Sequence, residues 1–487
     1  MADDAAPILV WFRRDLRLED NPALTFAART GRPVLPVYVF EDASELRPDG
    51  GAARWWLNHS LRALTETLKS RGLTLCIRRG TAGAVLNDLV PETGAGSIVW
   101  NRRYDAAEIA VDTDVKAQFK DAGVEVRSFN AHLLVEPWDM QTKSGGPFRV
   151  FTPFWRALSA RDDISGPYPI PETLTPFEGS VDSLKVEELG LLPALDWADA
   201  FSDLWEPGEA GAAKRLEAFL KSAVSTYSDR RDLPGKSGTS RLSPHLRFGE
   251  ISPRTIWHRT HRAKGSNGSA ASAETFLSEI AWREFSYHLL YYNPDLATKN
   301  YAPSFDAFPW AGDQMHLQAW QRGLTGYPIV DAGMRELWRY GWMHNRVRMI
   351  TASFLTKHLL IDWRQGEDWF WDTLVDADPA SNAASWQWVS GSGADAAPYF
   401  RIFNPILQGE KFDPEGTYVR AHVPELAMLD RKWLHKPWEA PASALEAAGV
   451  RLGDTYPHPI VDHRSARQAA LDAYQSMKSA DPPALSA

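Results

Sequence analysis

The stretch Ile8-Leu9-Val10-Trp11-Phe12-Arg13-Arg14-Asp15-Leu16-Arg17 decides how the fold begins. The apolar run Ile8–Phe12 predicts a buried strand. In an ordinary dinucleotide-binding fold, a Gly-x-Gly-x-x-Gly turn would follow such a strand. Charged residues stand there instead, from Arg13 to Arg17. The first sheet of this chain is therefore not expected to hold a pyrophosphate in that way.

Strands and helices alternate in the sequence that follows. Helix-like segments such as Ala53–Arg71 and Ala106–Ala122 separate further β-rich runs. This alternation predicts a doubly wound parallel sheet with helices on both faces. The further strands are expected at Pro33–Phe40, Thr74–Arg78, Ser97–Asn101 and Glu125–Phe129.

The sequence pattern changes twice in the rest of the chain. Prolines punctuate an acidic stretch from about Ser165 to Ala213, which is typical of a surface connector. After Lys214 the pattern is helical almost to the end, with helices expected at Thr275–Tyr292, Tyr327–Tyr340, Met343–Leu360 and Gly366–Leu374. We therefore predict an α/β domain at 1–135, a linker at 136–213 and an all-α domain at 214–487.

Composition narrows the class of protein. The chain has 487 residues, a net charge of −9 and one cysteine, Cys76, so neither an internal disulfide nor a Cys-ligated metal cluster is expected. The N-terminus lacks the pattern of a secretory or transit signal, and no apolar run is long enough for a membrane span, which makes the cytoplasm the default. The acidic balance argues against a nucleic-acid binder, although the arginine-rich stretch 335–348 leaves room for a basic groove.

Four segments of the helical part carry polar chemistry. Gly238–Pro244 clusters hydroxyls and one guanidinium before a helical stretch, which suits a phosphate or a capped turn. On a helix, Glu279, Trp282, Arg283 and Ser286 share one face. So do Asn345, Arg348 and Met349. The fourth segment, Asp376–Asn382, offers two carboxylates and an amide to a polar heterocycle. No histidine or third acid stands at ligand spacing, so no metal site is expected.

These four segments resemble the flavin and substrate motifs of the cryptochrome/photolyase family. So do Trp11–Arg17 and Gly326–Ala332, and the likeness runs in order from about residue 8 to about 470. It is strongest to cyclobutane pyrimidine dimer photolyases of the bacterial class III group, which is related to plant cryptochromes. The resemblance implies an α/β antenna domain, a linker and a helical domain that buries FAD.

The resemblance also implies a set of FAD-binding residues. Arg348 and Asp376 match the family's ion pair beside the flavin ring, and Asp378 matches the acceptor at the ring edge. The full set is Tyr227, Thr239, Ser240, Arg241, Leu242, Ser243, Phe276, Arg283, Trp342, Asn345, Arg348, Asp376, Asp378 and Asn382.

Asn382 matches the position that faces flavin N5. An amide there has no titratable proton to give, whereas plant cryptochromes carry an aspartate, so Asn382 favours repair over a blue-light photoreceptor, the alternative function. Photolyases for the (6-4) photoproduct place a histidine where Asn345 or Met349 stands, which disfavours that lesion. The residues expected to act on the flipped-out dimer and the flavin are Glu279, Trp282, Asn345, Met349, Asn382 and Trp388.

The implied chemistry is light-driven electron transfer from reduced FAD to the dimer. Trp386, Trp363 and Trp310 match the family's chain of tryptophans that reduces oxidised flavin. The partner is damaged DNA, and the chain is expected to be a monomer. DNA contacts are expected from Arg231, Glu279, Trp282, Asn345, Arg346, Arg401 and Gln408.

The antenna is less defined. Gly50–Leu57 resembles the class III group, which carries 5,10-methenyltetrahydrofolate, and Glu108 falls where some folate-binding photolyases have a glutamate. Its neighbour Ala107 departs from their asparagine. Folate is the expected antenna, and a deazaflavin or an empty site stays open. A dark flavin oxidoreductase would need a nicotinamide site, for which the sequence has no fingerprint.

Overall fold

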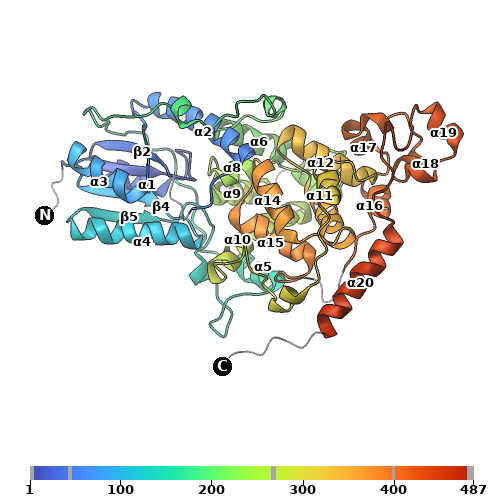
Figure 1. Cartoon of the computed structure of the whole chain (residues 1–487). Coiled ribbons are helices and arrows are strands. Elements are labelled where there is room, and N and C mark those ends of the chain that lie inside the picture. Colours follow the sequence, from blue (N-terminus) through green and yellow to red (C-terminus); the bar gives the residue numbers. More distant parts are fainter. Residues whose placement is uncertain (1–4, 42–45, 265–269, 397–400, 480–487) are drawn as a thin grey trace. The chain divides into compact units, whose positions relative to one another are not determined.

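The computed structural model describes residues 5–41, 46–264, 270–396 and 401–479 (Figure 1). The described residues form two compact units. Unit 1 is drawn from 1–225, 240–294 and 375–377, and unit 2 from 226–239, 295–374 and 378–487. Each unit is built from segments that are not consecutive in the sequence. The predicted domain borders at residues 135 and 213 stay a prediction.

Unit 1 contains a five-stranded parallel sheet in the order β3-β2-β1-β4-β5. The predicted α/β architecture is confirmed, and the strand limits differ from the expected ones by at most two residues. The apolar runs of the central strands are buried because helices cover both faces of the parallel sheet. The strands are β1 (Ile8–Phe12), β2 (Val34–Phe40), β3 (Cys76–Arg79), β4 (Ser97–Asn101) and β5 (Glu125–Phe129).

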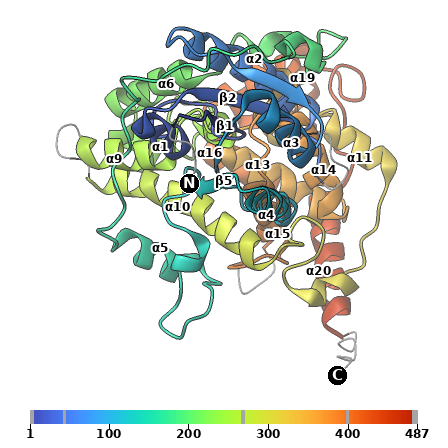
Figure 2. The ribbon, with the colours of Figure 1, turned by 90° about the vertical axis from the view of Figure 1, so that its left-hand side faces the viewer.

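Helices cover both faces of this sheet. The chain adds strands on one side of β1 first, as β2 and β3, and then on the other side, as β4 and β5. Because the crossovers are right-handed, the helices of the first half cover one face of the sheet and those of the second half cover the other. Leu9 and Trp11 of β1 pack with Leu86 of α3 (Ala82–Thr93) and Phe119 of α4 (Ala106–Asp121). The other face meets α1 (Pro22–Thr30), and α2 (Gly51–Lys69) connects β2 to β3. Figure 2 views α4 nearly end on, beside β5.

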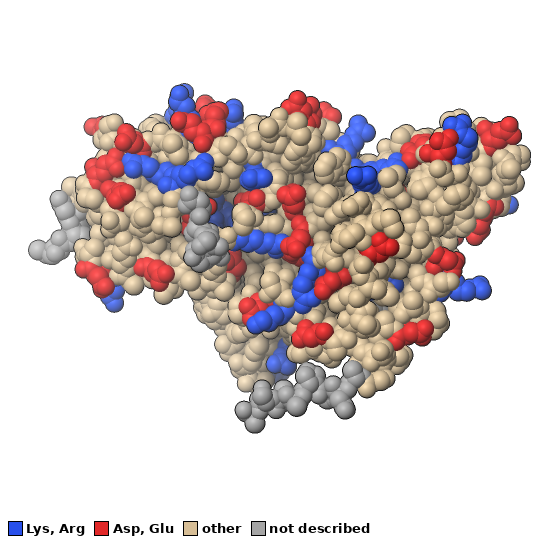
Figure 3. All heavy atoms as spheres, in the orientation of Figure 1, with Lys and Arg blue, Asp and Glu red and all other residues tan. Residues whose placement is uncertain are grey.

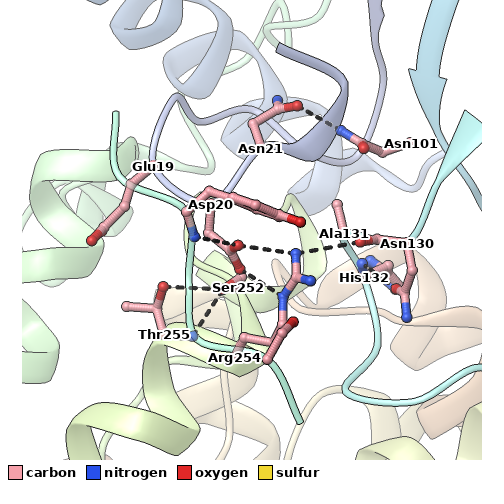
Figure 4. Close-up of polar contacts among 12 residues, drawn as sticks. Glu19, Asp20, Asn21, Asn101, Asn130, Ala131, His132, Ser252, Arg254 and Thr255 are labelled. Carbon is pink, nitrogen blue, oxygen red and sulfur yellow. Dashed lines mark hydrogen bonds and ion pairs between the residues drawn. The ribbon is translucent and has the colours of Figure 1, made fainter. Parts of the chain in front are cut away.

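Buried polar contacts join the carboxyl ends of the strands to the helices of unit 1. Asn101, at the end of β4, donates to Asn21 Oδ1 at 2.8 Å. Arg254 Nε donates to Asp20 Oδ2 at 3.0 Å, and its Nη2 donates to the Asn130 carbonyl at 3.3 Å (Figure 4). Arg254 belongs to α9 (Pro253–Ala263), whose N-terminus is capped by Ser252. The sheet edge and α9 are thus tied by charge-assisted hydrogen bonds.

Four more helices of unit 1 follow the sheet in sequence. Among them, α5 lies inside the segment that was expected to be a linker. Its Phe151, Phe154 and Leu158 are buried at i, i+3 and i+7, so it packs as an amphipathic helix. The four are α5 (Phe151–Ser159), α6 (Glu209–Ser222), α8 (Ser243–Arg247) and α10 (Ala270–Tyr292).

Unit 2 is helical throughout its described part. One helix was expected over Met343–Leu360, but α13 ends at Ser353 and a π-helical turn, η6 (Phe354–His358), continues it. α14 packs against α15, and α13 packs against both α12 and α15. The helices are α7 (Tyr227–Arg230), α11 (Gln314–Gln321), α12 (Pro328–Tyr340), α13 (Asn345–Ser353), α14 (Trp363–Thr373), α15 (Pro379–Ser390), α16 (Pro405–Phe412), α17 (Thr417–His422), α18 (Arg431–Leu434), α19 (Ala442–Ala447) and α20 (His463–Ser479).

The surface charges are mixed. On the face drawn in Figure 3, Lys and Arg side chains are interleaved with Asp and Glu side chains. The net charge of −9 is therefore not gathered into one acidic patch on that face. Within the described ranges, no helix has the length and hydropathy needed to cross a membrane.

Candidate functional site

The α10 face predicted from sequence is present in unit 1. Trp282 and Arg283 are half-buried, and Glu279 lies one turn before them on the same helix. The Trp282 ring stacks on Phe151 of α5, with ring centroids 3.7 Å apart and planes 10° apart. Ser286 Oγ donates to the Trp282 carbonyl at 2.9 Å. The indole is therefore held in one plane from one side, a contact that the sequence did not reveal.

Arg283 is held by groups from the sheet side of unit 1. Its Nη1 donates to the His132 carbonyl at 2.8 Å, its Nη2 contacts His132 Nε2 at 2.6 Å, and its guanidinium lies 4.9 Å from the Tyr287 ring centroid. Burial, and next the charge of Arg283, lower the pKa of His132 well below its ordinary value. The neutral imidazole can therefore accept from the guanidinium.

Part of the predicted phosphate segment is tied to a predicted flavin residue. Ser243, the first residue of α8, donates through Oγ to Asp376 Oδ2 at 2.6 Å. Arg241 adopts a left-handed backbone conformation with φ 51°, which is strained for a non-glycine residue. Leu242 is buried, while Thr239 and Ser240 are partly exposed. Phe276, another residue predicted to bind FAD, is a core residue that packs on Phe219 with centroids 4.5 Å apart.

Asn382 of α15 has a fixed orientation in unit 2. Its Nδ2 donates to Glu367 Oε1 at 2.8 Å and to the Glu367 carbonyl at 3.1 Å. The backbone carbonyl can only accept, so the amide nitrogen must face Glu367. The carbonyl oxygen Oδ1 is then the atom that the side chain presents to other groups. Asp378 caps the same helix, since its Oδ1 accepts from Ser381 N at 2.8 Å.

The third predicted segment lies on α13, which packs against α15. Arg348 Nε donates to the Met343 carbonyl at 2.7 Å, and its guanidinium lies 5.8 Å from the ring of buried Trp342. Met349 is half-buried and Asn345, at the helix start, is exposed. The structure thus brings the Asn345–Met349 segment and α15 together, and a shared binding region stays a prediction. The expected pairing of Arg348 with Asp376 stays a prediction.

Two of the three predicted electron-transfer tryptophans are deeply buried. Trp363 donates through Nε1 to Asn300 Oδ1 at 2.9 Å. Trp386 packs against α14 three residues from Trp363, because a Cβ on Gly366 would lie only 2.2 Å from the Trp386 ring. Trp310 is partly buried beside Phe308, with ring centroids 4.4 Å apart. The roles of the three in electron transfer stay a prediction.

Two of the predicted DNA-binding residues meet in unit 2, and a third lies on a helix that one of them contacts. Arg346 pairs with Asp232 at 2.8 Å and stacks on Phe412 of α16, the helix that also carries Gln408. Arg231 approaches the same Asp232 at 3.9 Å and its guanidinium lies 5.5 Å from the ring of Tyr227. Asp232 therefore holds two arginines in one place, and the sequence alone did not point to it.

Trp388 and Arg401 line a second feature of unit 2. Together with Ser353, Lys357, Gly391 and Phe403 they surround a small cavity of about 20 Å³. The Lys357 amine donates to the Arg401 carbonyl. Lys357 was not among the predicted residues. A lysine in a short polar run between two apolar pairs, as in Phe354–Leu360, is the signal that could have found it.

Glu108, the predicted antenna residue, is buried in an ion-pair cluster of unit 1. Its Oε1 lies 2.7 Å from Arg103 Nη1 and 3.5 Å from Arg14 Nη2. Burial acts to raise the pKa of Glu108, but Arg103 and Arg14 together hold it below its ordinary value. Burial and the nearby Glu108 raise the pKa of Asp105 to about 8. Asp105 is therefore protonated more readily than an exposed aspartate.

Comparisons with known proteins agree over nearly the whole chain. The profile described as "DNA photolyase" matches residues 8–174, and the one described as "FAD binding domain of DNA photolyase" matches 276–476. A "Deoxyribodipyrimidine photo-lyase" of Agrobacterium fabrum is 57% identical over 98% of this chain and 99% of its own length. "Cryptochrome-2" of Arabidopsis thaliana is 40% identical over 97% of this chain and 79% of its own length.

Solved structures agree with the fold as well. A bacterial class III photolyase from Agrobacterium tumefaciens superposes with a TM-score of 0.95 at 56% identity, covering 97% of this chain and 98% of the other. A Synechocystis cryptochrome gives a TM-score of 0.88 at 30% identity, covering 96% and 99%. With both profiles in place and full-length relatives at this identity, the chain belongs to the DNA photolyase family and carries that family's FAD-binding domain.

Proposed function

We propose that this protein is a light-driven DNA repair enzyme, a deoxyribodipyrimidine photo-lyase that splits cyclobutane pyrimidine dimers. Reduced FAD, when bound and excited by light, supplies the electron that opens the dimer. The observation that carries the proposal is the anchoring of Asn382, whose amide nitrogen is held on Glu367. The presented atom is therefore a carbonyl oxygen, which accepts a proton donor and has no proton of its own to give.

This arrangement suits a flavin kept in its reduced form. Reduced flavin carries a hydrogen on N5, and an acceptor facing N5 favours that form over one without it. An aspartate at the same place would bring a titratable proton, as expected for the photoreceptor alternative. The other residues of unit 2 fit the polar ring as well, since Arg348 offers a guanidinium, Asp378 a carboxylate and Trp342 an apolar face.

The chain's own residues have separate tasks in this proposal. Trp282 and Trp388 provide flat apolar walls for a flipped-out dimer, and Glu279 accepts or donates at a thymine edge. Asn345 and Met349 contact the base on the α13 side. Tyr227 and the segment 239–243 hold the FAD phosphates, whose charge the Arg241 guanidinium offsets. The remaining FAD contacts come from Phe276, Arg283, Asp376 and Asn382.

Two further groups complete the proposal. Trp386, Trp363 and Trp310 carry electrons to oxidised flavin, supported by the packing of Trp386 on the helix that begins with Trp363. Arg231, Arg346, Arg401 and Gln408 bind DNA phosphates, which gives register without sequence preference. We propose that the enzyme acts as a monomer in the bacterial cytoplasm, at the nucleoid where its DNA substrate lies.

We further propose 5,10-methenyltetrahydrofolate as the antenna, bound by unit 1. Glu108 is enclosed by Arg103 and Arg14, so its part is to hold these arginines in place. The purified chromophores can be released and identified by absorbance and mass. A deazaflavin, or no second chromophore after loading with folate, would contradict this assignment and leave the repair activity intact.

The repair activity is tested on a duplex oligonucleotide with one thymine dimer. FAD-loaded, reduced protein is incubated with it under blue light and in darkness, and restored thymines are counted by chromatography. Repair in light alone supports the proposal. Protein that binds reducible FAD yet restores no thymine in light would overturn it in favour of a photoreceptor or another lesion.

A further inference from the structure

The cavity beside Trp388 contains a buried lysine that the proposed chemistry does not use. Its volume of about 20 Å³ is enough for one water molecule. Lys357 forms one wall and only 4% of it is exposed. Fully buried lysines are rare unless they are paired or functional, because their charge is costly to bury. The feature therefore needs a reason beyond packing.

Two side chains of one helix turn tie the segment 401–403 in place. The Lys357 amine donates to the Arg401 carbonyl, and Ser353 Oγ accepts from Phe403 N at 3.5 Å. Ser353 and Lys357 are four residues apart, at the junction where α13 passes into the π-helical turn η6. Such turns are rare, and they are frequent at functional sites.

The tied segment carries a proposed DNA contact beside a proposed pocket wall. Arg401 is exposed and Trp388 is half-buried, and both line the same cavity as Lys357. Lys357 lies too deep to reach a phosphate itself. It can, however, set the position of the backbone from which the Arg401 side chain extends, on the wall of the cavity that Trp388 also lines.

We propose that Lys357 is a positioning residue for lesion binding, which holds the Arg401 segment at the cavity that Trp388 lines and makes DNA affinity depend on pH. This inference rests on the proposed function. It assigns Lys357 no contact with DNA, dimer or flavin. It predicts that changes at Lys357 alter the affinity for damaged DNA and leave FAD binding and the photochemical step unchanged.

Because Lys357 can gain or lose its charge near neutral pH, the proposal predicts a measurable pH dependence of DNA binding. Burial, and next the charge of Arg401, lower its pKa to about 7. Among the described residues, the charge of Arg401 acts on Lys357, and His358 lies beside it on η6, in contact with His463 of α20. The pKa of His358 is lowered to about 3 by burial and that of His463 is also lowered, so both are neutral above pH 6.5.

The direction of the pH dependence of DNA affinity follows from the linkage between proton binding at Lys357 and DNA binding. A phosphate on Arg401 would offset that arginine's repulsion and favour the charged amine, so DNA binding takes up a proton at Lys357. The charged amine also makes the stronger hydrogen bond to the Arg401 carbonyl. Affinity for dimer-containing DNA should therefore fall about three- to tenfold from pH 6.5 to pH 8.5, which corresponds to a pKa shift of up to about one unit.

The test compares Lys357→Met, Lys357→Arg and a control, Lys299→Met, in FAD-loaded protein. Lys299 is an exposed lysine of unit 2 that pairs only with the neighbouring Asp295 among the contacts described. Dissociation constants are measured from pH 6.5 to pH 8.5 at fixed salt, with a duplex that carries one thymine dimer and with the undamaged duplex. FAD content and repair under saturating enzyme are measured alongside.

The proposal expects about tenfold weaker lesion binding for Lys357→Met at pH 6.5, with unchanged FAD content and unchanged repair per bound dimer. The pH dependence of the affinity should vanish in Lys357→Met and stay in Lys299→Met. In Lys357→Arg the affinity should be high and independent of pH, since arginine does not titrate in this range. Wild-type affinity and pH dependence in Lys357→Met would overturn it.

Lys357→Arg keeps the test decisive if the methionine variant does not fold. In that case, a Lys357→Arg protein that retains the wild-type pH dependence would overturn the proposal. Failure of the proposed function shows itself separately, because wild-type protein would then neither bind the dimer selectively nor repair it in light at any pH.

Discussion

Asn382→Asp is the substitution that probes the site most directly. In the native protein the Asn382 amide donates to Glu367 Oε1 at 2.8 Å, and both side chains are buried, with 8% and 2% of each residue exposed. The substitution replaces this donor with a second carboxyl group. A buried carboxyl next to another carboxylate cannot easily ionise, so its pKa must rise.

The rise in pKa and the loss of folding stability can be worked out from the distance between the two carboxyl groups. If the two charges lie as far apart as Asn382 Nδ2 and Glu367 Oε1 do now, 2.8 Å, and Glu367 is ionised, they repel by about 6 kcal/mol at an effective dielectric constant of about 20. That corresponds to about 4 pKa units, which puts the introduced carboxyl near pKa 8, against about 3.9 in the unfolded chain. Because the folded pKa is the higher one, the destabilisation is absent at low pH and grows as pH rises towards 8. We expect a cost of about 1.5 kcal/mol at pH 5 and about 5 kcal/mol at pH 8.

Thermal unfolding of FAD-loaded protein at pH 5 and pH 8 measures this difference. The melting temperature should fall by about 3–6 °C at pH 5 and by more than about 10 °C at pH 8. Adding Glu367→Gln to Asn382→Asp removes the second charge and should restore most of the loss at pH 8, with Glu367→Gln alone completing the double-mutant cycle. Equal losses at the two pH values, or no rescue, would refute the electrostatic reasoning.

Four further predictions use other parts of the site. Trp282→Ala should weaken dimer binding about 5- to 100-fold with FAD retained, since base stacking on an aromatic ring contributes about 1–3 kcal/mol; normal lesion affinity would remove Trp282 from the pocket. Trp310→Phe should slow photoreduction of oxidised flavin and spare repair by reduced enzyme, and unchanged reduction kinetics in a flash experiment would exclude it from the chain.

Asp232→Asn should strengthen binding to damaged and undamaged DNA alike and steepen the salt dependence by about one charge, because two arginines lose their acidic partner; an unchanged salt slope would contradict this. Asp105→Asn keeps the cap of α4 and removes a carboxyl whose pKa is raised to about 8. Since the folded state of the native protein loses stability between pH 4 and pH 8 through this group, the variant should melt higher at pH 8 and equally at pH 4.

Much of the fold follows from local sequence patterns. Ile8–Phe12, Ser97–Asn101 and Glu125–Phe129 form strands at the expected limits. In the first two, a short apolar run indicates a buried strand without reference to its partners. Glu125–Phe129 is a half-buried strand at the sheet edge, in which only Val126 and Phe129 are apolar. The helix expected over Met343–Leu360 is continuous in direction but changes to a π turn after Ser353. Its sequence pattern shows no Pro or Gly at that point, so periodicity could not reveal the change.

In the site, too, some residues could be found from local sequence and others only from the fold. The motifs around Trp282, Asn345 and Asn382 could be found because their residues are near one another in sequence. Phe151 could not, since it lies 131 residues before Trp282, the residue on which it stacks. Asp232 stands next to Arg231 in sequence, yet its stronger partner is Arg346. Pairs of this kind leave no periodic signal within either segment.

The sequence by itself determined the alternation of strands and helices, the missing phosphate fingerprint after the first strand and the chemical types at the site, because all of these are properties of neighbouring residues. The tertiary structure alone decided which way the Asn382 amide points, that the pKa of Asp105 is raised and that the pKa of Lys357 is lowered. The physical reason is that donor orientation and pKa depend on burial and on charges brought close by folding, and distant segments supply both.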